Sequence, residues 1–524
     1  MTLTVRKNYL VVPTAPQAPV RRVRFLAEQQ CVLALDLQAE PLHPTFFAFL
    51  DMRPWMGMEL ELEGLPELPL RQTDGIDLPD LYREPYRPRI HYTPKCGWSN
   101  DPNGLIWSEG TYHMYYQYNP ASTAWGNMHW GHAVSPDLLH WTERGIALHP
   151  DRLGVVYSGS GIRDRDNRTG LGTARDPALL FYYTAYGDLR DPSSAVQCLA
   201  WSTDHGNTLR RYAGNPILGN LAGGNRDPKA VWCPELDCYL MIFYLERDQF
   251  QLCRSDDLLH WTLHQRITME GEEECPELLP MTASDGRKLW VMTAVHNHYL
   301  VGEFREGRFT PIQPVRQFCY GRIWATQTFS EQPDGRLIRI AWNTLHLDNP
   351  RFSQQMSFPT EATLHAEPEG YVLRQRPIAE LERLVAETRT ETGSVGGSAG
   401  TWEIPLSDDP YDIRLRLPAG RGNVTLELFG VELCCDERAG TAALGGECFP
   451  LRSSGGEIRL QLLADTCSVE LFEDDGAVLC TVRRDPAAPH HGLTLRAAAL
   501  HENVRVTCRR LQGIWEAQAA GESG

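Results

Sequence analysis

One pentapeptide occurs twice in this chain, 120 residues apart. Asp-Leu-Leu-His-Trp occupies 137–141 and returns at 257–261, each time between two strand-like apolar runs and two positions after a serine. A third Ser-x-Asp, at 202–204, lies between the two copies. A repeat of about 60 residues built from short strands and turns is typical of β-propeller blades. The region 86–376 is therefore predicted to hold about four or five blades, and a β-sandwich with a chance duplication is the alternative.

The N-terminal residues have a strand pattern of their own. Apolar residues alternate with others over 23–37 and again over 58–62. This alternation predicts a small β domain over residues 1–85 that includes the segment leading to the propeller.

A second β-rich region follows the repeats. Residues 377–400 are predicted to form a linker that begins with a short helix at 378–384. Strict alternation then returns in runs such as 413–417, and Asp475-Gly476 is typical of a hairpin turn. We therefore expect a C-terminal β-sandwich over 401–524, so that the whole chain is all-β.

Composition limits the classes of function. The chain has 524 residues and a formal net charge of −17, whereas nucleic acids and anionic membranes are bound through basic faces, so neither partner is expected. The sequence has no recognisable export signal and no apolar run long enough to span a bilayer. The 14 cysteines include no Cys-x-x-Cys pair and no metal-ligand spacing. These features predict a cytoplasmic protein without metal or cofactor, and a homo-oligomer is compatible with them.

The segment with the most chemical character is Trp-Ser-Asn-Asp-Pro-Asn-Gly at 98–104, which places one carboxylate between amides, a proline and a glycine. The proline pushes Asp101 toward an extended or bridge conformation, and Gly104 can turn the chain directly afterwards. Taken alone, Asp-Pro-Asn-Gly is also an ordinary turn. The aromatic run 112–118 that follows predicts a covered strand, and its Gln117 supplies a neutral amide suited to sugar hydroxyls.

Further blocks accompany this segment in order along the chain. They are Tyr116-Gln117-Tyr118-Asn119-Pro120, Trp130-Gly131-His132, Ser158-Gly159-Ser160, Arg226-Asp227-Pro228-Lys229, Glu274-Cys275-Pro276 and Met356-Ser357-Phe358-Pro359. Together they resemble glycoside hydrolase family 32, the invertases, inulinases and levanases. The resemblance runs from about Arg89 to Pro377 and continues more weakly to the C-terminus. It implies five blades, a C-terminal sandwich and hydrolysis of bonds to fructose.

Glycoside cleavage usually needs one carboxyl group to protonate the departing oxygen and another to attack or stabilise the anomeric carbon. By the resemblance, Asp101 is the nucleophile of a retaining mechanism, about 5 Å from the acid/base Glu274. Asp227 corresponds to the transition-state stabiliser, which holds sugar hydroxyls by charge-assisted hydrogen bonds. The residues implied around the fructosyl ring are Asn100, Gln117, Trp125, Ser160 and Arg226. Of these, Arg226 either orients Asp227 or contacts substrate, and Trp125 is either a stacking platform or core.

Two of the acids have competitors. Glu274 stands among three other acids, Glu272, Glu273 and Glu277. The residues alone favour none of the four, and only the Cys-Pro after Glu274 matches the family. Arg175-Asp176-Pro177 repeats the letters around Asp227, but only the latter continues into a lysine and an aromatic strand.

Three positions depart from the family pattern. Glu273 stands where family members commonly have tryptophan, which removes an expected aromatic wall beside Glu274. Cys319 and Trp324 stand where aspartate and tyrosine are usual, on a loop that is predicted to border the pocket. Changes there would alter the preference for the leaving group.

The resemblance and the residues together predict a β-fructofuranosidase that acts with retention on sucrose, short fructo-oligosaccharides or related small fructosides. Three alternatives stay open. A five-bladed pentosidase would act by inversion, and an inactive relative would bind sugar without turnover. A transfructosylase would pass the fructosyl group to another sugar.

Overall fold

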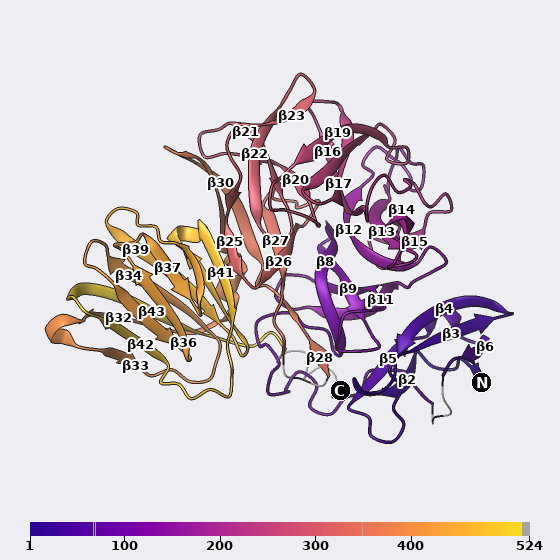
Figure 1. Ribbon diagram of the computed structural model, residues 1–524, viewed down its shortest axis with the longest axis horizontal. Coiled ribbons are helices and arrows are strands. Elements are labelled where there is room, and N and C mark those ends of the chain that lie inside the picture. Colours follow the sequence, from indigo (N-terminus) through magenta and orange to yellow (C-terminus); the bar gives the residue numbers. More distant parts are fainter. Residues whose placement is uncertain (66–67, 69, 348, 350, 516–524) are drawn as a thin grey trace.

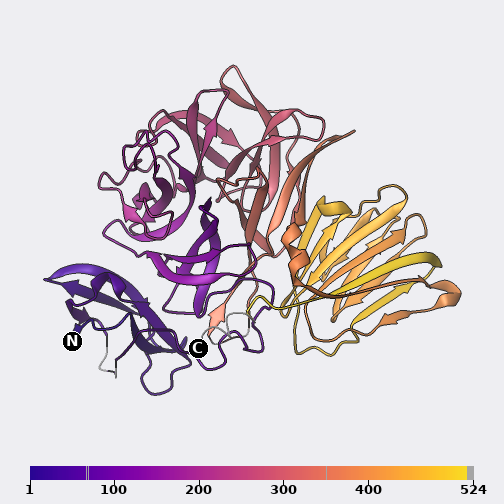
Figure 2. The ribbon, with the colours of Figure 1, turned by 180° about the vertical axis from the view of Figure 1, so that it is seen from behind.

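The structure is a computed structural model and describes residues 1–65, 68, 70–347, 349 and 351–515. Its regular elements are almost entirely strands, which form three units along the chain (Figure 1). The N-terminal unit and the C-terminal sandwich lie on different sides of a central ring of sheets, as the view from behind also shows (Figure 2). This arrangement confirms the predicted all-β class. Among the described residues, no helix is both long and apolar enough to cross a lipid bilayer.

The N-terminal unit consists of two small antiparallel sheets. The first has the order β1 (Thr2–Thr4), β6 (Glu59–Glu63), β3 (Arg21–Ala27), β4 (Gln30–Leu37). The second has the order β5 (Phe46–Asp51), β2 (Tyr9–Thr14), β7 (Arg71–Thr73), with the 3-10 turn η1 (Arg53–Trp55) after β5. β3 and β4 are the strands that the alternation predicts, and their inward residues Phe25 and Leu35 are fully buried. Their apolar cluster extends to Cys96 and Ala121 of the propeller, so the two units share a core.

Five sheets follow, and each is a blade of the propeller. Blade 1 contains β8 (Gly97–Ser108), β9 (Thr111–Asn119), β10 (His129–Ser135) and β11 (Thr142–Leu148), with β28 (Phe352–Ser353) added beside β8. Blade 2 contains β12 (Val155–Arg163), β13 (Leu179–Tyr186), β14 (Ala195–Ser202) and β15 (Arg210–Arg211), with the 3-10 turn η2 (Pro192–Ser194) before β14. Blade 3 contains β16 (Arg226–Cys233), β17 (Cys238–Glu246), β18 (Gln249–Ser255) and β19 (Thr262–Thr268).

The last two blades complete the ring. Blade 4 contains β20 (Glu277–Thr282), β21 (Lys288–Thr293), β22 (His298–Arg305) and β23 (Arg308–Pro311), with β24 (Arg316–Gln317) paired to β22. Blade 5 contains β26 (Ile323–Thr328), β27 (Leu337–Asn343), β30 (Thr360–Glu367) and β31 (Gly370–Pro377), with β29 (Gln355–Met356) paired to β27. β8 contacts β12 and β26, and β16 contacts β12 and β20. The first strands of the blades therefore surround one axis, where residues distant in sequence meet.

The repeated pentapeptide is the turn between the third and fourth strands of a blade. In blade 1, Asp137 Oδ1 accepts hydrogen bonds from the amides of Leu139 and His140, at 3.1 and 2.9 Å. In blade 3, Asp257 Oδ1 likewise accepts from the amides of Leu259 and His260, at 2.9 and 2.8 Å. In blade 2, Asp204 follows the third strand, where its Oδ1 accepts a bond from Ser202. The repeat therefore marks the blades because each turn needs the same local hydrogen bonds.

The C-terminal region is a sandwich of two sheets. The first has the order β25 (Cys319–Gly321), β41 (Val478–Arg483), β40 (Ser468–Glu473), β39 (Glu457–Ala464), β34 (Tyr411–Pro418), β43 (His501–Leu511), β32 (Val385–Val395). The second has the order β33 (Trp402–Ile404), β42 (Leu493–Ala497), β35 (Val424–Leu428), β36 (Val431–Asp436), β37 (Thr441–Leu444), β38 (Glu447–Pro450). The predicted hairpin at Asp475-Gly476 is present as η5 (Asp474–Gly476) between β40 and β41.

The segment predicted as a linker, 377–400, is mostly ordered structure. The expected short helix is the 3-10 segment η3 (Ala379–Leu384), but β32 follows it directly and pairs with β43, so the sandwich begins at Val385. Another 3-10 turn, η4 (Gly397–Ala399), precedes β33. The sequence predicts a linker here because no local pattern marks this strand, whereas pairing with β43 supplies the backbone partners that hold it at the edge of the sheet.

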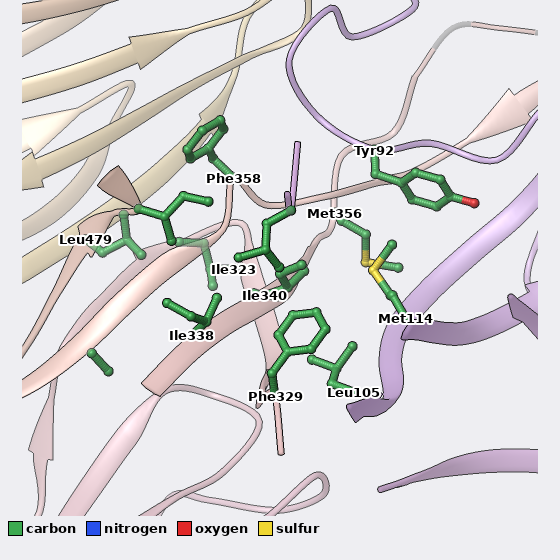
Figure 3. Packing of buried hydrophobic residues seen from close by; sticks show 14 of the residues in the cluster. Tyr92, Leu105, Met114, Ile323, Phe329, Ile338, Ile340, Met356, Phe358 and Leu479 are labelled. Carbon is green, nitrogen blue, oxygen red and sulfur yellow. The ribbon is translucent and has the colours of Figure 1, made fainter. Parts of the chain in front are cut away.

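One apolar cluster joins blade 1, blade 5 and the sandwich. Figure 3 shows Leu105 and Met114 of blade 1 close to Phe329 and Ile340 of blade 5, with Leu479 of the sandwich in the same cluster. These side chains are all less than 5% exposed. The cluster closes the ring between its first and last blades and holds the sandwich to that junction.

Candidate active site

Three carboxylates that the sequence singles out come from first strands or lie directly before one. Asp101 lies in β8, Asp227 lies in β16, and Glu274 lies three residues before β20. The Cys275 thiol is 3.6 Å from Oδ2 of both Asp101 and Asp227. Glu274 Oε1 accepts a 3.0 Å bond from Nε of Arg226, the residue before Asp227. The propeller therefore gathers all three acids at one place on its axis.

Irregular pairing in β8 aims Asp101. The register of β8 against β9 shifts between Ser99 and Pro102 and again between Asn103 and Ile106. Such bulges redirect side chains next to functional sites. Asp-Pro-Asn-Gly is thus part of a strand rather than a turn, although Gly104 has the positive φ of 53° that favours glycine.

Two neighbours hold the Asp101 carboxylate from both sides. Ser158 of β12 donates to Asp101 Oδ2 at 2.6 Å, and Asn100 Nδ2 donates to Oδ1 at 3.1 Å. Asn100 is held in turn by Trp98, whose Nε1 donates to its Oδ1 at 2.8 Å. The orientation of Asp101 is therefore set by hydrogen bonds that exist before any substrate binds.

Backbone strain accompanies the other two acids. Asp227, Glu274 and Cys275 have φ values of 65°, 39° and 45°, in the left-handed region that non-glycine residues rarely occupy. Hydrogen bonds stabilise this conformation, because the Cys275 amide donates to Asp227 Oδ2 at 3.0 Å and the Asp227 amide donates to Thr184 Oγ1 at 3.0 Å. Strained backbone of this kind clusters at functional sites.

Crowding of negative charge changes the acidity of the site. Burial raises the pKa of Asp227 to about 7; Arg226 opposes this shift, and the charges of Glu274 and Asp101 add to it. Burial also raises the pKa of Asp101, against the bond from Ser158 and together with the charge of Glu274. The acids are therefore electrostatically coupled, as expected for carboxylates that share one site.

Arg226 is fixed among these groups. Its Nη1 donates to the Gly224 carbonyl at 2.7 Å, and its guanidinium lies 4.6 Å from the centre of the Tyr244 ring. Its Nε is 4.0 Å from Asp227 Oδ2 while it also bonds Glu274. Arg226 thus bonds Glu274 and lies beside Asp227. The bond to Glu274 is neither of the two roles that the sequence leaves open, which were to orient Asp227 or to contact substrate.

The structure separates Glu274 from its three competitors. The Glu272 carboxylate is fully buried and accepts bonds from the amides of His296 and His298. Glu277 is 1% exposed and forms ion pairs with Lys229 and Arg339, at 3.0 and 3.1 Å. The Glu273 side chain is 45% exposed and points to His296. Only Glu274 of the four bonds Arg226, which itself neighbours Asp227.

The second Arg-Asp-Pro lies apart from this centre. Asp176 is in the loop before β13, where its amide donates to Thr173 Oγ1 at 3.0 Å and its carbonyl accepts from the Thr173 amide. These are turn contacts, which match the expectation that Asp176 is a turn aspartate.

The residues expected around a fructosyl ring divide into two groups. Gln117 is 2% exposed and its Nε2 has no hydrogen-bond partner among the described residues, so a buried donor is left for a ligand. Trp125 is 48% exposed, which excludes the core alternative, and its role as a stacking platform stays a prediction. Ser160 is engaged elsewhere, because its hydroxyl donates to the Pro228 carbonyl and accepts from the Ala230 amide. Ser158 bonds Asp101 instead, since the register of β12 shifts between Val156 and Gly159.

Cys319 and Trp324 were both expected on a loop that borders the pocket, and this expectation is wrong for Cys319. Cys319 is buried in β25, which pairs with β41 of the sandwich, and its thiol accepts a bond from Gln375. Trp324, by contrast, packs edge-on against His296 and Trp342, with ring centroids 5.0 and 6.4 Å apart. Trp342 in turn contacts Trp98 at 6.1 Å. An aromatic wall therefore runs from blade 5 to Asn100, although the tryptophan expected before Glu274 is missing.

Sequence reasoning did not identify Ser158 or Trp342 as parts of the site. Ser158 was within a family-like block, but the block has two serines and only a bulge distinguishes them. Trp342 lies in an ordinary strand pattern and carries no local signal.

Among the described residues, no group of three or more His, Cys, Asp or Glu side chains is arranged to hold a metal ion.

Comparisons with known proteins agree with this geometry. The family model described as "Glycosyl hydrolases family 32 N-terminal domain" matches residues 91–377. The chain is 30% identical to a levanase of Bacillus subtilis over 83% of this chain and 72% of the relative. It is 27% identical to an extracellular exo-inulinase of Aspergillus awamori over 84% of this chain and 97% of the relative. A crystal structure of exo-inulinase from Aspergillus awamori has a TM-score of 0.74 at 24% identity and covers 83% of this chain and 100% of its own. The chain therefore belongs to glycoside hydrolase family 32.

Proposed function

We propose that the protein is a retaining hydrolase that releases terminal β-fructofuranosyl units from fructosides. The observation that carries this proposal is the convergence of Asp101, Asp227 and Glu274 around Cys275 and Arg226 at the propeller axis. The similarity to a levanase and an exo-inulinase supports fructans and shorter fructosides as the substrate class. Retention requires carboxyl groups about 5 Å apart, and Glu274 directly precedes Cys275, whose thiol is 3.6 Å from Asp101 Oδ2.

In the first step, a carboxylate oxygen of Asp101 forms a bond to the anomeric carbon of fructose. The bond from this carbon to the departing oxygen breaks, and Glu274 donates a proton to that oxygen. Ser158 and Asn100 hold Asp101 in line, so little orientational freedom is lost at the transition state. Asp227 accepts hydrogen bonds from sugar hydroxyls, which strengthen as the ring flattens.

In the second step, Glu274 takes a proton from water, whose oxygen attacks the anomeric carbon and releases Asp101. The attack comes from the face that the leaving group left, so the product has the β configuration. Arg226 keeps the Glu274 carboxylate turned toward the axis in both steps.

The test is the configuration of the fructose first released, followed by NMR during hydrolysis of sucrose and kestose. Retention predicts the β-anomer and a fructosyl adduct on a peptide containing Asp101 after acid quenching. Release of the α-anomer would favour the inverting pentosidase type of chemistry, and binding without product would favour an inactive relative. Kestose-length or longer products from concentrated sucrose would indicate transfructosylation. Sucrose 6-phosphate, inulin and levan in the same panel define the leaving group.

We further propose that the protein works in a reducing compartment such as the cytoplasm. The support is its cysteines, since all 14 are free and 11 of them are buried. Fractionation of the producing cells tests this proposal: fructosidase activity is expected in the cytosolic fraction, and activity in the medium would contradict it.

A further inference from the structure

A cavity of about 640 Å³ lies between the N-terminal unit and blades 1 and 2. The N-terminal unit lines it with Val20, Arg22 and Asp36, and the propeller contributes Trp125 and Leu189. Val20, Trp125 and Leu189 are 65%, 48% and 48% exposed, so three of the chain's exposed large apolar side chains meet at one cavity. The rest of the lining is largely polar or charged, and aromatic or apolar side chains beside hydrogen-bonding groups suit a sugar, which has apolar faces and a rim of hydroxyls.

Two tyrosines connect this cavity to the catalytic acids. Tyr186 lines the cavity, and its ring centroid is 5.2 Å from that of Tyr157. Tyr157 is also 6.2 Å from Trp125 and directly precedes Ser158, which bonds Asp101. Burial raises the pKa of Tyr157, and the charges of Arg226, Asp227 and Glu274 also act on its phenol. The cavity therefore adjoins the catalytic centre through Tyr186 and Tyr157.

The two tyrosines meet the catalytic centre beside Arg226 and Glu274, which is the side of the departing oxygen in the proposed mechanism. A Cβ atom at Gly224 would lie 3.2 Å from Arg226 Nη1 and 3.3 Å from the Tyr186 hydroxyl, so Tyr186 is next to Arg226. Arg226 bonds Glu274, the proposed acid. Because the acid must lie beside the departing oxygen, the sugar units beyond that oxygen extend toward Tyr186 and the cavity.

The N-terminal wall of the cavity is held rigidly against the propeller. Asn127 accepts a 2.8 Å bond from the Asp36 amide and donates a 2.9 Å bond to the Asp36 carbonyl. Nearby, Arg53 of the N-terminal unit donates to the Arg144 carbonyl at 3.1 Å. Arg22 pairs with Asp36 at 3.2 Å, and both side chains are more than half exposed, so their donors and acceptors are accessible to a ligand.

We propose that the N-terminal unit completes a binding site for the leaving-group units of a fructo-oligosaccharide. Val20 and Trp125 pack against sugar faces, and Arg22 and Asp36 bond their hydroxyls. This inference rests on the proposed function, and it makes chain length a determinant of specificity. A disaccharide places its single leaving unit beside Glu274, whereas longer chains reach the cavity.

The test compares kcat/KM on sucrose and on a five-unit fructo-oligosaccharide for the full-length protein and its Arg22→Ala and Val20→Ser variants. We expect the preference for the oligosaccharide over sucrose to fall roughly three- to tenfold, through KM rather than kcat, because a binding interaction away from the reacting atoms is lost. Equal losses on both substrates, or no loss, would overturn the proposal.

Arg24→Ala is the matched control. Arg24 lies on the same strand as Arg22 and pairs with Glu63 at 3.1 Å. The side chains of this pair are 51% and 47% exposed, which is close to the 56% and 54% of Arg22 and Asp36. It does not line the cavity. The substrate preference of this variant is expected to equal that of the parent, and a loss like that of Arg22→Ala would overturn the proposal.

A binding measurement separates this inference from the proposed function. Calorimetry on Asp101→Asn with the same oligosaccharide, with and without Arg22→Ala, needs no turnover. If the parent shows no hydrolysis and Arg22→Ala nevertheless weakens binding, the proposed function fails and the cavity assignment stands. Unchanged affinity, or absence of any binding, overturns the assignment, whereas the proposed function is overturned by a parent that hydrolyses no fructoside.

Discussion

At the scale of single residues, Cys275 is the common neighbour of the two aspartates. Its thiol is 3.6 Å from Oδ2 of Asp101 and of Asp227, and its amide bonds the latter. Burial and the nearby carboxylates raise the pKa of this thiol well above its usual range, so it stays protonated and neutral between two acids. A neutral spacer at this position keeps the site from gaining a further negative charge.

The assignment of Glu274 as acid/base predicts a specific pattern of activity. Glu274→Gln is expected to lower kcat on sucrose by about 10²- to 10⁴-fold, the usual contribution of a positioned general acid. Steady-state kinetics with Glu273→Gln as the neighbouring control should show a much smaller change, because Glu273 points to His296 instead. Comparable losses in both variants would contradict the assignment.

The raised pKa of Asp227 predicts a pH dependence of stability. The unfolded aspartate ionises near pH 4 and the folded one at about pH 7, so the folded state holds the extra proton and stability falls as pH rises between these values. Asp227→Asn removes this loss. The difference in Tm between this variant and the parent should therefore be larger at pH 8 than at pH 5, by about 2 to 5 °C in favour of the variant. Calorimetry that finds a constant difference in Tm would show that Asp227 ionises normally.

At the scale of elements, a buried ion cluster ties three strands together. Glu277 of β20 pairs with Lys229 of β16 and Arg339 of β27, and the three side chains are at most 6% exposed. Burial alone would raise the pKa of Glu277, but the two cations outweigh it and hold the pKa below its usual range. The cluster fixes β16, which bears Asp227, and β20, which begins three residues after Glu274.

Removing the charge of Glu277 leaves two buried cations without the carboxylate that neutralises them. Glu277→Gln is therefore expected to lower the free energy of unfolding by about 3 to 5 kcal/mol. Urea unfolding followed by tryptophan fluorescence measures this loss. Glu63→Gln breaks the exposed pair with Arg24 and should change stability by less than about 1 kcal/mol. A similar effect of both substitutions would mean that the buried cluster is not a stabilising link.

At the scale of the whole molecule, His91 links the propeller to the sandwich. Its Nδ1 is 2.7 Å from Asp465 Oδ2 and its Nε2 is 3.4 Å from Glu470 Oε2. Burial by itself lowers the pKa of His91, but Glu470 and Asp465 outweigh it and raise the pKa to about 10. A cationic histidine between two buried carboxylates therefore holds the domains together at neutral pH.

This linkage predicts how stability changes in alkaline solution. A histidine with a raised pKa stabilises the fold fully below pH 6.5, and that contribution is lost as pH rises toward 10. The Tm of the parent should fall from pH 7 to pH 10, whereas His91→Gln should have a lower Tm at pH 7 and a flatter profile. Scanning calorimetry at fixed ionic strength checks both. An equally steep decline in the variant would mean that His91 is neutral in the fold. This window lies above that of Asp227, so the two effects are separable.

Much of the architecture is predictable from local sequence. The alternation at 23–37 predicts β3 and β4, and the repeated Asp-Leu-Leu-His-Trp marks a turn whose hydrogen bonds lie within a few residues. Periodicity and turn chemistry act over short distances, so a single sequence displays them directly. The predicted linker at 377–400 was less accurate because its strand is held by β43, more than a hundred residues away.

The sequence by its patterns predicted a propeller of four or five blades and a C-terminal sandwich, and it contained the short blocks from which the three acids come. Three features depend on the folded chain: which of four neighbouring glutamates bonds Arg226, which serine holds Asp101, and the position of Cys319 at the junction with the sandwich. The physical reason is that the first group depends on contacts between nearby residues, whereas the second depends on strands from different blades meeting at one axis. Bulges in β8 and β12 set the direction of side chains there, and no local pattern records them.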